Sequence, residues 1–347
     1  MYKFVRNLAP IRILMHKTLI YLILPLLLIN CTTGTEQTTS DKRITRTQVT
    51  ATPIFNADTA YSYVAKQVSF GPRVPGTDAH ALAASWLVEK LNGFADTVIV
   101  QSFRVRLYTK AGMDGQNIIA SFNPGAEKRV LLAAHWDTRP YADHDPDPAF
   151  HRTPIDGAND GGSGVGVLLE LARLLKNNPV DPKLGIDIIL FDLEDYGPHN
   201  EQRTFRDEDF WALGSQYWAR NQHRPSYRAR YGILLDMVGA ADAFFPREYY
   251  SQQYAPWVLD KVWQTASRLG YSHAFSNSPG PPINDDHVPV NRYAGIPMIN
   301  IIHIDTGSSN GSFFEYWHTM KDNLDHIDIE TLRMVGKLIT TVIYEEQ

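Results

Sequence analysis

The sequence predicts an α/β fold: a single domain with a mixed, largely parallel central β-sheet and helices on both faces. Four short apolar runs recur along the chain, and helical stretches separate them. The runs are continuously apolar, which is typical of strands buried on both faces. Each run also closes on polar residues. Because ligands of such sheets bind beyond the carboxyl ends of the strands, those residues mark the expected functional site.

The first 31 residues predict an export signal, not a part of the fold. Four lysines and arginines precede the apolar stretch Leu19–Ile29. Its eleven residues, at 1.5 Å each, are too few to cross ~30 Å of hydrocarbon. Cys31, the only cysteine, follows directly after Asn30. This arrangement resembles a bacterial lipoprotein signal, whose cysteine becomes the lipidated first residue. The alternative is an ordinary signal peptide with an incidental cysteine.

Residues 32–53, rich in Thr, Ser and Gln, predict a flexible tether, and residues 54–347 predict one enzyme domain. The expected location is the cell envelope of a bacterium, on a membrane-anchored lipoprotein facing the periplasm or the exterior. The expected membrane contact is through the lipid anchor alone. With a single cysteine, disulfides and cysteine-metal sites are excluded. Any metal must therefore be held by histidine and carboxylate.

Composition favours a small-molecule or peptide partner. The chain has 347 residues and a formal net charge of -5, and no run of lysine and arginine appears in it. We therefore expect no nucleic-acid partner.

The elements follow in order. Helices are predicted at 56–68 and 78–92, each with an Asn or Asp suited to the N-cap, and turn residues 71–77 lie between them. Residues 97–109 and 116–122 predict paired strands. The four apolar runs are 129–137, 186–195, 231–237 and 296–302. Further helices are predicted at 161–176, 209–221, 255–269 and 328–346.

The second apolar run ends on three carboxylates, Asp192, Glu194 and Asp195. Like charges this close raise one another's pKa, so the cluster costs stability unless a cation or a proton-transfer role accompanies it. Asp192 lies earlier on the strand and is predicted to face away in a structural role.

Several common motifs are excluded. The stretch "GGSGVG" lacks the spacing of a dinucleotide-binding loop, and Val165 stands where a nucleophile-elbow serine at 163 would need glycine. The chain also has no HExxH motif. A serine hydrolase and a zincin are therefore disfavoured.

What remains is a dispersed set of His and acidic residues. In this order they resemble the zinc-dependent exopeptidase superfamily, which contains dinuclear aminopeptidases and glutaminyl-peptide cyclotransferases, over roughly residues 55–347. The resemblance implies a Zn²⁺ site held by carboxylates and imidazole with one position open. It also implies a cis peptide at Asp160–Gly161. The implied zinc ligands are Asp160, Asp195 and His318, where many relatives have Glu in place of Asp195, and the implied general base and acid is Glu194.

Three stretches, "HWDTRPYADHD" (135–145), "NDDHVP" (284–289) and "YWHTMKDN" (316–323), resemble bacterial glutaminyl-peptide cyclotransferases. The family implies an acyltransferase with one zinc ion per chain, which converts the N-terminal glutamine of peptides or proteins to pyroglutamate and releases ammonia. Asp236 and Asp285 would act with Glu194. The implied substrate-binding residues are Trp317, Trp211, Asn300, where animal relatives have histidine, and Phe314, for which Phe313 is the alternative.

Two other functions stay open. In a dinuclear aminopeptidase, His135 and Asp236 would hold a second zinc bridged by Asp160, whereas a cyclotransferase would keep these two in supporting hydrogen bonds. Asp137, like His135, is a candidate for either a supporting role or a second metal. A catalytically silent metal-binding lipoprotein is disfavoured by the presence of Glu194. Metal content would separate the two enzymes, with one zinc for the cyclotransferase and two for the aminopeptidase.

Overall fold

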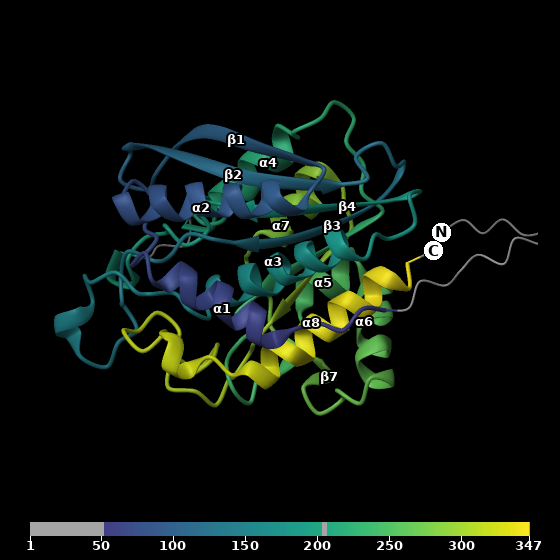
Figure 1. The fold of residues 1–347 in the computed structure, drawn as a ribbon. Helices are drawn as coiled ribbons and strands as arrows, with labels where there is room; N and C mark the ends of the chain where they lie inside the picture. Colours follow the sequence, from purple (N-terminus) through teal and green to yellow (C-terminus); the bar gives the residue numbers. More distant parts are fainter. Residues whose placement is uncertain (1–51, 203–206, 347) are drawn as a thin grey trace, which may run out of the picture. The chain divides into compact units, whose positions relative to one another are not determined.

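A six-stranded mixed sheet lies at the centre of the fold (Figure 1). The structure is a computed structural model that describes residues 52–202 and 207–346, which lie in one compact unit. The first three strands pair antiparallel and the rest pair parallel, so the predicted fold class is confirmed. In sheet order the strands are β1 (Thr97–Arg106), β2 (Gly112–Phe122), β4 (Leu184–Phe191), β3 (Lys128–His135), β5 (Tyr231–Asp236) and β8 (Met298–Ile302).

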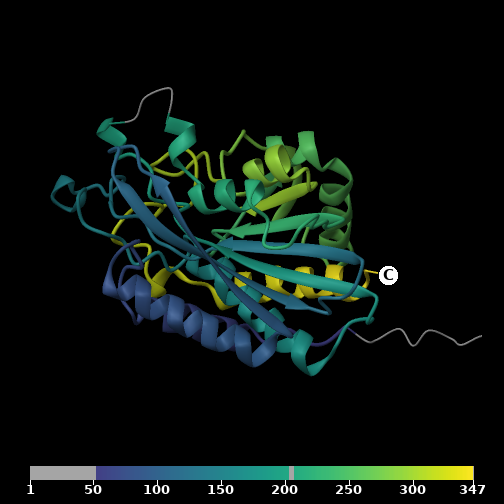
Figure 2. The same ribbon diagram turned by 90° about the horizontal axis from the view of Figure 1, so that it is seen from above.

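Helices cover both faces of this sheet (Figure 2). The larger core lies between the sheet and α1, α2, α3, α6 and α8, and α4 covers the opposite face. The helices are α1 (Ala57–Val68), α2 (Asp78–Phe94), α3 (Gly162–Asn177), α4 (Leu213–Arg220), α5 (Tyr249–Tyr254), α6 (Pro256–Arg268), α7 (His287–Pro289) and α8 (Ile329–Tyr344). A second, two-stranded sheet pairs β6 (Phe245–Arg247) with β7 (Phe275–Pro279).

Burial on both faces explains why the strand runs are apolar throughout. On β3, Val130, Leu132 and Ala134 enter the larger core, whereas Leu131 and Ala133 enter the core under α4. Successive side chains of a strand point to opposite faces, so each of these positions must be apolar.

Helix starts are set by side-chain caps. Asn56 accepts a hydrogen bond from the Thr59 amide at the start of α1, and Asp328 does the same for Thr331 at the start of α8. Such caps typically contribute ~1 kcal/mol. The cap of α2 is Thr77 and not the expected Asp78, because the Thr77 hydroxyl receives the amide hydrogen of His80.

The helix predicted at 209–221 is wrong in its first part. The described chain has a short 3₁₀ turn at Asp207–Phe210, and α4 begins only at Leu213. Between them Ala212 adopts the left-handed region, with φ of 53°. The amides of Ala212 and Leu213 donate to the carbonyls of Glu194 and Leu193, at 3.0 and 2.9 Å. These long-range bonds to the end of β4 override the local helical pattern.

The predicted export signal and Cys31 lie outside the described residues, as does all of the tether except residues 52 and 53. Among the helices of the described ranges, none combines the length and the apolar character needed to cross a bilayer.

Candidate metal centre

The predicted site residues converge at the carboxyl ends of neighbouring parallel strands. His135 ends β3, Asp236 ends β5, and Glu194 and Asp195 follow β4. Since β4, β3 and β5 are adjacent in the sheet, these side chains meet at one edge. Two loops complete the site, with Asp160 in the turn before α3 and His318 in the segment before α8.

Asp160, Asp195 and His318 form a compact group of metal-ligand type. One atom from each lies within 4.8 Å of the others, and all three are buried. His318 Nε2 lies 3.2 Å from Asp195 Oδ1 and 3.5 Å from Asp160 Oδ2. The other oxygen of Asp195 is buried without a hydrogen-bond partner. Two carboxylates, one of which has an unpartnered buried oxygen, and one imidazole fit a zinc ion, which takes oxygen and imidazole ligands.

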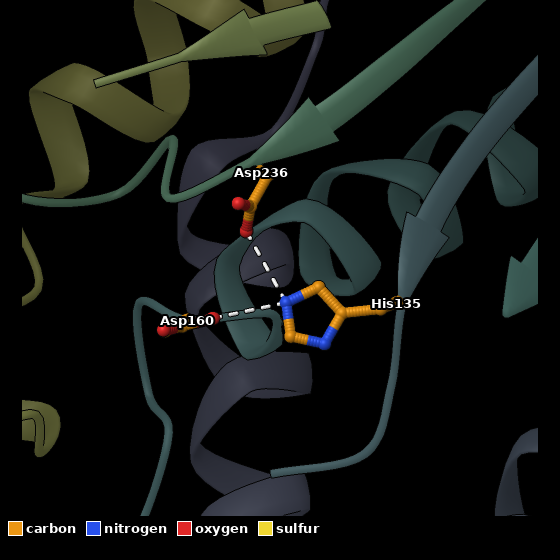
Figure 3. Close-up of side chains that lie close together, drawn as sticks. All are labelled: His135, Asp160 and Asp236. Carbon is orange, nitrogen blue, oxygen red and sulfur yellow. Dashed lines mark hydrogen bonds and ion pairs between the residues drawn. The ribbon is translucent and has the colours of Figure 1, made fainter. Parts of the chain in front are cut away.

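A second group shares Asp160 with the first. His135 Nε2 points between Asp160 and Asp236, at 2.9 Å from one carboxylate and 3.2 Å from the other (Figure 3). Burial disfavours the charged imidazolium, but Asp137, Asp160 and Asp236 outweigh burial and raise the pKa of His135 well above its usual value. Burial also raises the pKa of Asp236 to about 7. This group can hold a proton or, with the same atoms, a second metal ion.

Asp137 holds the backbone of Glu194 and Asp195, the acidic pair of the site, in place. Its two carboxylate oxygens accept hydrogen bonds from the backbone amides of Glu194 and Asp195, at 3.1 and 3.2 Å. His135 Nδ1 lies 3.5 Å from the same carboxylate. The spacing of the His-x-Asp motif therefore couples the imidazole of β3 to the backbone that follows β4.

Glu194 is the acid of this site whose carboxylate has no hydrogen-bond or ion-pair partner in the described part of the chain. Among the described residues, no hydrogen bond or ion pair involves its carboxylate, which lines the pocket beside Asp195 and Asp236. Burial raises the pKa of Glu194 well above its usual value, and the charges of Asp285 and Asp195 add to the effect while His135 opposes it. A carboxylate with a raised pKa is suited to accept and return a proton.

Three site positions are held in strained backbone. Leu193 just before Glu194, Met237 just after Asp236, and His318 itself have φ of 57°, 49° and 54°. Such left-handed conformations cost about 1–3 kcal/mol for residues other than glycine, and they concentrate at functional sites. The strain aims the adjoining side chains into one pocket.

Asp192 has the predicted structural role. Its carboxylate is buried away from the pocket, where Oδ1 lies 2.9 Å from His80 Nε2 and Oδ2 accepts from the Gln116 amide at 2.8 Å.

The glycine-rich turn fixes Asp160 by close packing. A Cβ on Gly161 would lie 2.3 Å from the carbonyl oxygen of His135, so only glycine fits. The carboxylate of Asp322 accepts the amides of Asn159 and Asp160 and holds the turn from the other side. The expected cis peptide after Asp160 is wrong here: the described residues contain no cis peptide bond. The trans form is the default because a non-proline cis bond costs about 2.5–4 kcal/mol.

Sequence reasoning missed Arg139 and Asp143, although both lie in the quoted stretch 135–145. Arg139 is fully buried and makes a two-pronged contact with the Asp143 carboxylate, at 2.9 and 2.6 Å. It also donates to the carbonyl of Asp195 at 3.1 Å. Asp143 Oδ1 lies 3.5 Å from His318 Nδ1, the ring nitrogen that faces away from the metal group. A carboxylate in this position orients a zinc-binding histidine and raises its basicity.

Replacing Asp143 with Asn is expected to weaken zinc binding about 10- to 100-fold, because His318 loses the charge that orients its ring. Competition with a chromophoric chelator measures the affinity. Asp147→Asn, at an exposed cap, is the control and should bind zinc like the wild type. Equal affinity in the Asp143 variant would contradict the positioning role.

The metal group opens into a pocket of about 370 Å³. Acidic side chains and His318 lie on one side of it, and apolar side chains form the walls. The Trp317 ring stacks on His318 at 3.8 Å between centroids, and Phe313 packs on Trp317 at 4.6 Å. The wall and rim residues are Trp211, Met237, Pro282, Ile283, Asn284, Ile302, Ser312, Phe313 and Trp317.

Two predicted substrate contacts are corrected. Phe313, and not Phe314, lines the pocket. Phe313 bridges to Ile304 as in a strand, so the next side chain points the other way, and Phe314 is buried against Met237 and Ile302. Asn300 does not reach the pocket either: it is fully buried on β8 and donates to Asp285 Oδ2 at 2.6 Å. Its role is to hold Asp285, which lines the pocket.

Comparison with known proteins shows the family of this chain. The profile of peptidase family M28 matches residues 117–343. A solved glutaminyl cyclase from Bacteroides thetaiotaomicron, bound to N-acetylhistamine, is 47% identical with a TM-score of 0.82, and the match covers 85% of this chain and 100% of that one. A Zn-dependent exopeptidase from Parabacteroides distasonis is 50% identical, with the same TM-score and coverage. The glutaminyl-peptide cyclotransferase of Gloydius blomhoffii is 26% identical over an alignment of 302 residues, and the match covers 79% of this chain and 77% of the relative.

Proposed function

The chain belongs to peptidase family M28, and we propose that within it the protein is a zinc-dependent glutaminyl-peptide cyclotransferase, which converts the N-terminal glutamine of peptides and proteins to pyroglutamate. The observation that carries the proposal is one aromatic-walled pocket that contains both the Asp160–Asp195–His318 group and the unengaged carboxylate of Glu194. The similarity to a glutaminyl cyclase at 47% identity over its whole chain supports it.

The reaction joins the α-amine of the substrate to its own γ-amide carbon and releases the amide nitrogen as ammonia. A zinc ion bound by Asp160, Asp195 and His318 would polarise the amide carbonyl as a Lewis acid. Glu194 accepts a proton from the attacking amine and donates it to the departing ammonia. Its raised pKa fits both steps, because the same carboxyl group must take up a proton and then give it away.

The rest of the pocket holds the substrate residue in its reactive geometry. Attacking and attacked atoms belong to one residue, so orientation alone supplies much of the acceleration. Trp317 and Phe313 enclose the side chain and exclude water, and Asp236 and Asp285 line the pocket where they can accept hydrogen bonds from the amine and amide nitrogens. A pocket of about 370 Å³ suits recognition of a single residue.

Purified protein is expected to release ammonia from peptides that begin with glutamine and to leave leucine p-nitroanilide intact. A coupled ammonia assay and release of p-nitroaniline, run side by side on one preparation, measure the two activities. The opposite pattern would replace the proposal with an aminopeptidase.

That alternative has one observation in its favour. His135, Asp160 and Asp236 form a second group of metal-ligand type within 4.8 Å, as a dinuclear aminopeptidase needs. Our proposal instead keeps His135 as a hydrogen-bonding partner of both carboxylates and assigns one zinc ion to each chain. Elemental analysis of purified protein separates the two, since a dinuclear enzyme would carry two.

We further propose that the protein is exported and anchored in the cell envelope through a lipid on Cys31, for which the basic and apolar pattern of residues 1–31 is the support. The Cys31→Ala variant is expected to leave the membrane fraction and appear in the soluble fraction. Immunoblots of the two fractions measure this. An unchanged distribution would mean that the cysteine is incidental.

A further inference from the structure

We propose that a second, acidic groove of this chain binds the guanidinium or ammonium group of a basic side chain in the peptide substrate, downstream of its N-terminal glutamine. Cationic recognition follows from the groove alone, whereas the assignment to a substrate rests on the proposed function. The groove is formed around Asp242, His303, Asp305, Glu315, Asp325 and Asp328.

Two adjoining cavities make up this acidic groove. One, of about 520 Å³, lies among residues 240–242, 314–316 and 325–328. The other, of about 480 Å³, lies among residues 244–246 and 278–281. Both are lined by Asp242, His303 and Asp305, so the three residues form the junction. The groove is therefore long enough for an extended peptide side chain together with neighbouring backbone.

The charge of the groove is of one sign. It is lined by five carboxylates and by no lysine or arginine. Within the described ranges, none of the five takes part in an ion pair. The ammonium of Lys321 lies 5.5 Å from the Tyr316 ring, but Lys321 lines neither cavity. Three of the five accept local hydrogen bonds, Asp305 from Gly307, Glu315 from Ser309 and Asp328 from Thr331 at the start of α8. Asp242 and Asp325 accept none from the described residues, so their charge in particular is open to a cationic partner.

His303 gives a second, independent sign of a ligand. Its side chain is 5% exposed and lines both cavities, and its Nδ1 has no hydrogen-bond partner. Burial lowers the pKa of His303 to about 4, even though Asp305 and Asp242 act in the opposite direction. The imidazole is therefore neutral at physiological pH, and a neutral imidazole nitrogen can accept a hydrogen bond from a cationic donor. An unpartnered buried nitrogen costs stability, which such a donor would relieve.

The arrangement fits an organic cation better than a metal ion. The only groups of three or more His and acidic side chains in the described residues whose ligand atoms all lie within 4.8 Å of one another are the two at the metal centre. The carboxylates of the groove therefore form no such compact group. A guanidinium presents several donors in a plane and is suited to reach more than one such carboxylate at once.

The groove and the metal-centre pocket share one wall. Ile302, Phe313 and Trp317 line the pocket, and their chain neighbours His303, Phe314 and Tyr316 line the groove. The wall itself is the small apolar cluster of Met237, Ala240, Ile302, Ile304 and Phe314. Neighbouring Cα atoms are about 3.8 Å apart, and an extended peptide advances about 3.3–3.6 Å per residue. The number of residues that span the wall sets which position after the glutamine meets the groove, and the peptide series below varies that position.

The test is a series of five-residue peptide amides that begin with glutamine, with one arginine, one glutamate or only alanines at positions two to five. The best arginine peptide is expected to have a kcat/KM about fivefold to tenfold above the all-alanine peptide at low salt, and the glutamate peptide the lowest value. Added salt should shrink the difference. The double variant Asp242→Asn/Asp305→Asn should lose the arginine preference while its kcat/KM for the all-alanine peptide is unchanged.

The control is Glu89→Gln/Glu127→Gln, which removes two exposed charges elsewhere and should keep the preference. An acetyl-blocked arginine peptide, titrated calorimetrically, tests the groove without turnover. Binding of this peptide to the wild type and not to the Asp242/Asp305 variant supports the groove. Failure to cyclise any glutamine peptide would refute the proposed function but not the groove. Equal kcat/KM for all peptides, with no binding of the blocked peptide, overturns the inference. Spermidine binding that depends on the two aspartates, without an arginine preference, would overturn its assignment to the substrate.

Discussion

The Glu194→Gln variant is expected to bind zinc as the wild type does and to lose turnover about 10²- to 10⁴-fold. Glutamine preserves the shape of the side chain but cannot exchange a proton. Because the Glu194 carboxylate makes no hydrogen bond or ion pair with the described residues, no structural contact is lost with it. Its backbone amide still donates to Asp137, so the acidic pair keeps its place.

The measurements are kcat for ammonia release and zinc per chain by elemental analysis. Glu127→Gln, an exposed position outside the pocket, is the matched control and should change neither quantity. Loss of zinc from the Glu194 variant would show that ligand and base have been exchanged in our assignment. Retention of activity would show that Glu194 does not carry out the proton transfers.

His318→Ala is expected to lose both zinc and activity. His318 is the only nitrogen ligand of the Asp160–Asp195–His318 group, and without it the two carboxylates lose the imidazole that lies beside both of them. The neighbouring acids, Asp195 above all, overcome burial and raise the pKa of His318 to about 10. His135 still contacts Asp160, and Arg139 still lies 3.7 Å from Asp195, but removing one partner of a buried charged group is strongly destabilising.

Zinc content and the rise of Tm on adding zinc test this second prediction. A ligand that binds the native state stabilises it according to its concentration relative to Kd, so the wild type should gain Tm and the variant should not. His273→Ala, at an exposed histidine that does not line the pocket, is the control. A His318 variant that keeps its zinc would indicate that the ion binds at the group of His135, Asp160 and Asp236.

The pattern of apolar and polar residues within short segments correctly predicted strands of the central sheet. The runs at 129–137 and 231–237 predicted strands β3 and β5, because a strand buried on both faces needs apolar residues at every position. Their polar ends predicted the edge of the sheet at which the site lies. The order of the site residues along the chain, through its family resemblance, predicted the Asp160–Asp195–His318 group that the structure brings within 4.8 Å.

Predictions from the pattern within one segment were wrong where contacts with distant segments decide the structure. The sequence 209–221 is helical by periodicity, yet Ala212 and Leu213 donate to the end of β4 and break the helix. Phe313 and Phe314 are chemically equal in the sequence, and only the bridge of Phe313 to Ile304 decides which ring faces the substrate.

The sequence by itself determined the sheet, the residue types of the metal group and the position of Glu194 beside Asp195, since these depend on spacing and periodicity along the chain. Only the tertiary structure decided that Asn300 supports Asp285, that Asp143 lies beside His318 and pairs with Arg139, and that five acids from four segments line one groove with His303. Those contacts join residues far apart in the chain. Their partners are chosen by packing and by the need to pair buried polar groups, which no window of sequence contains.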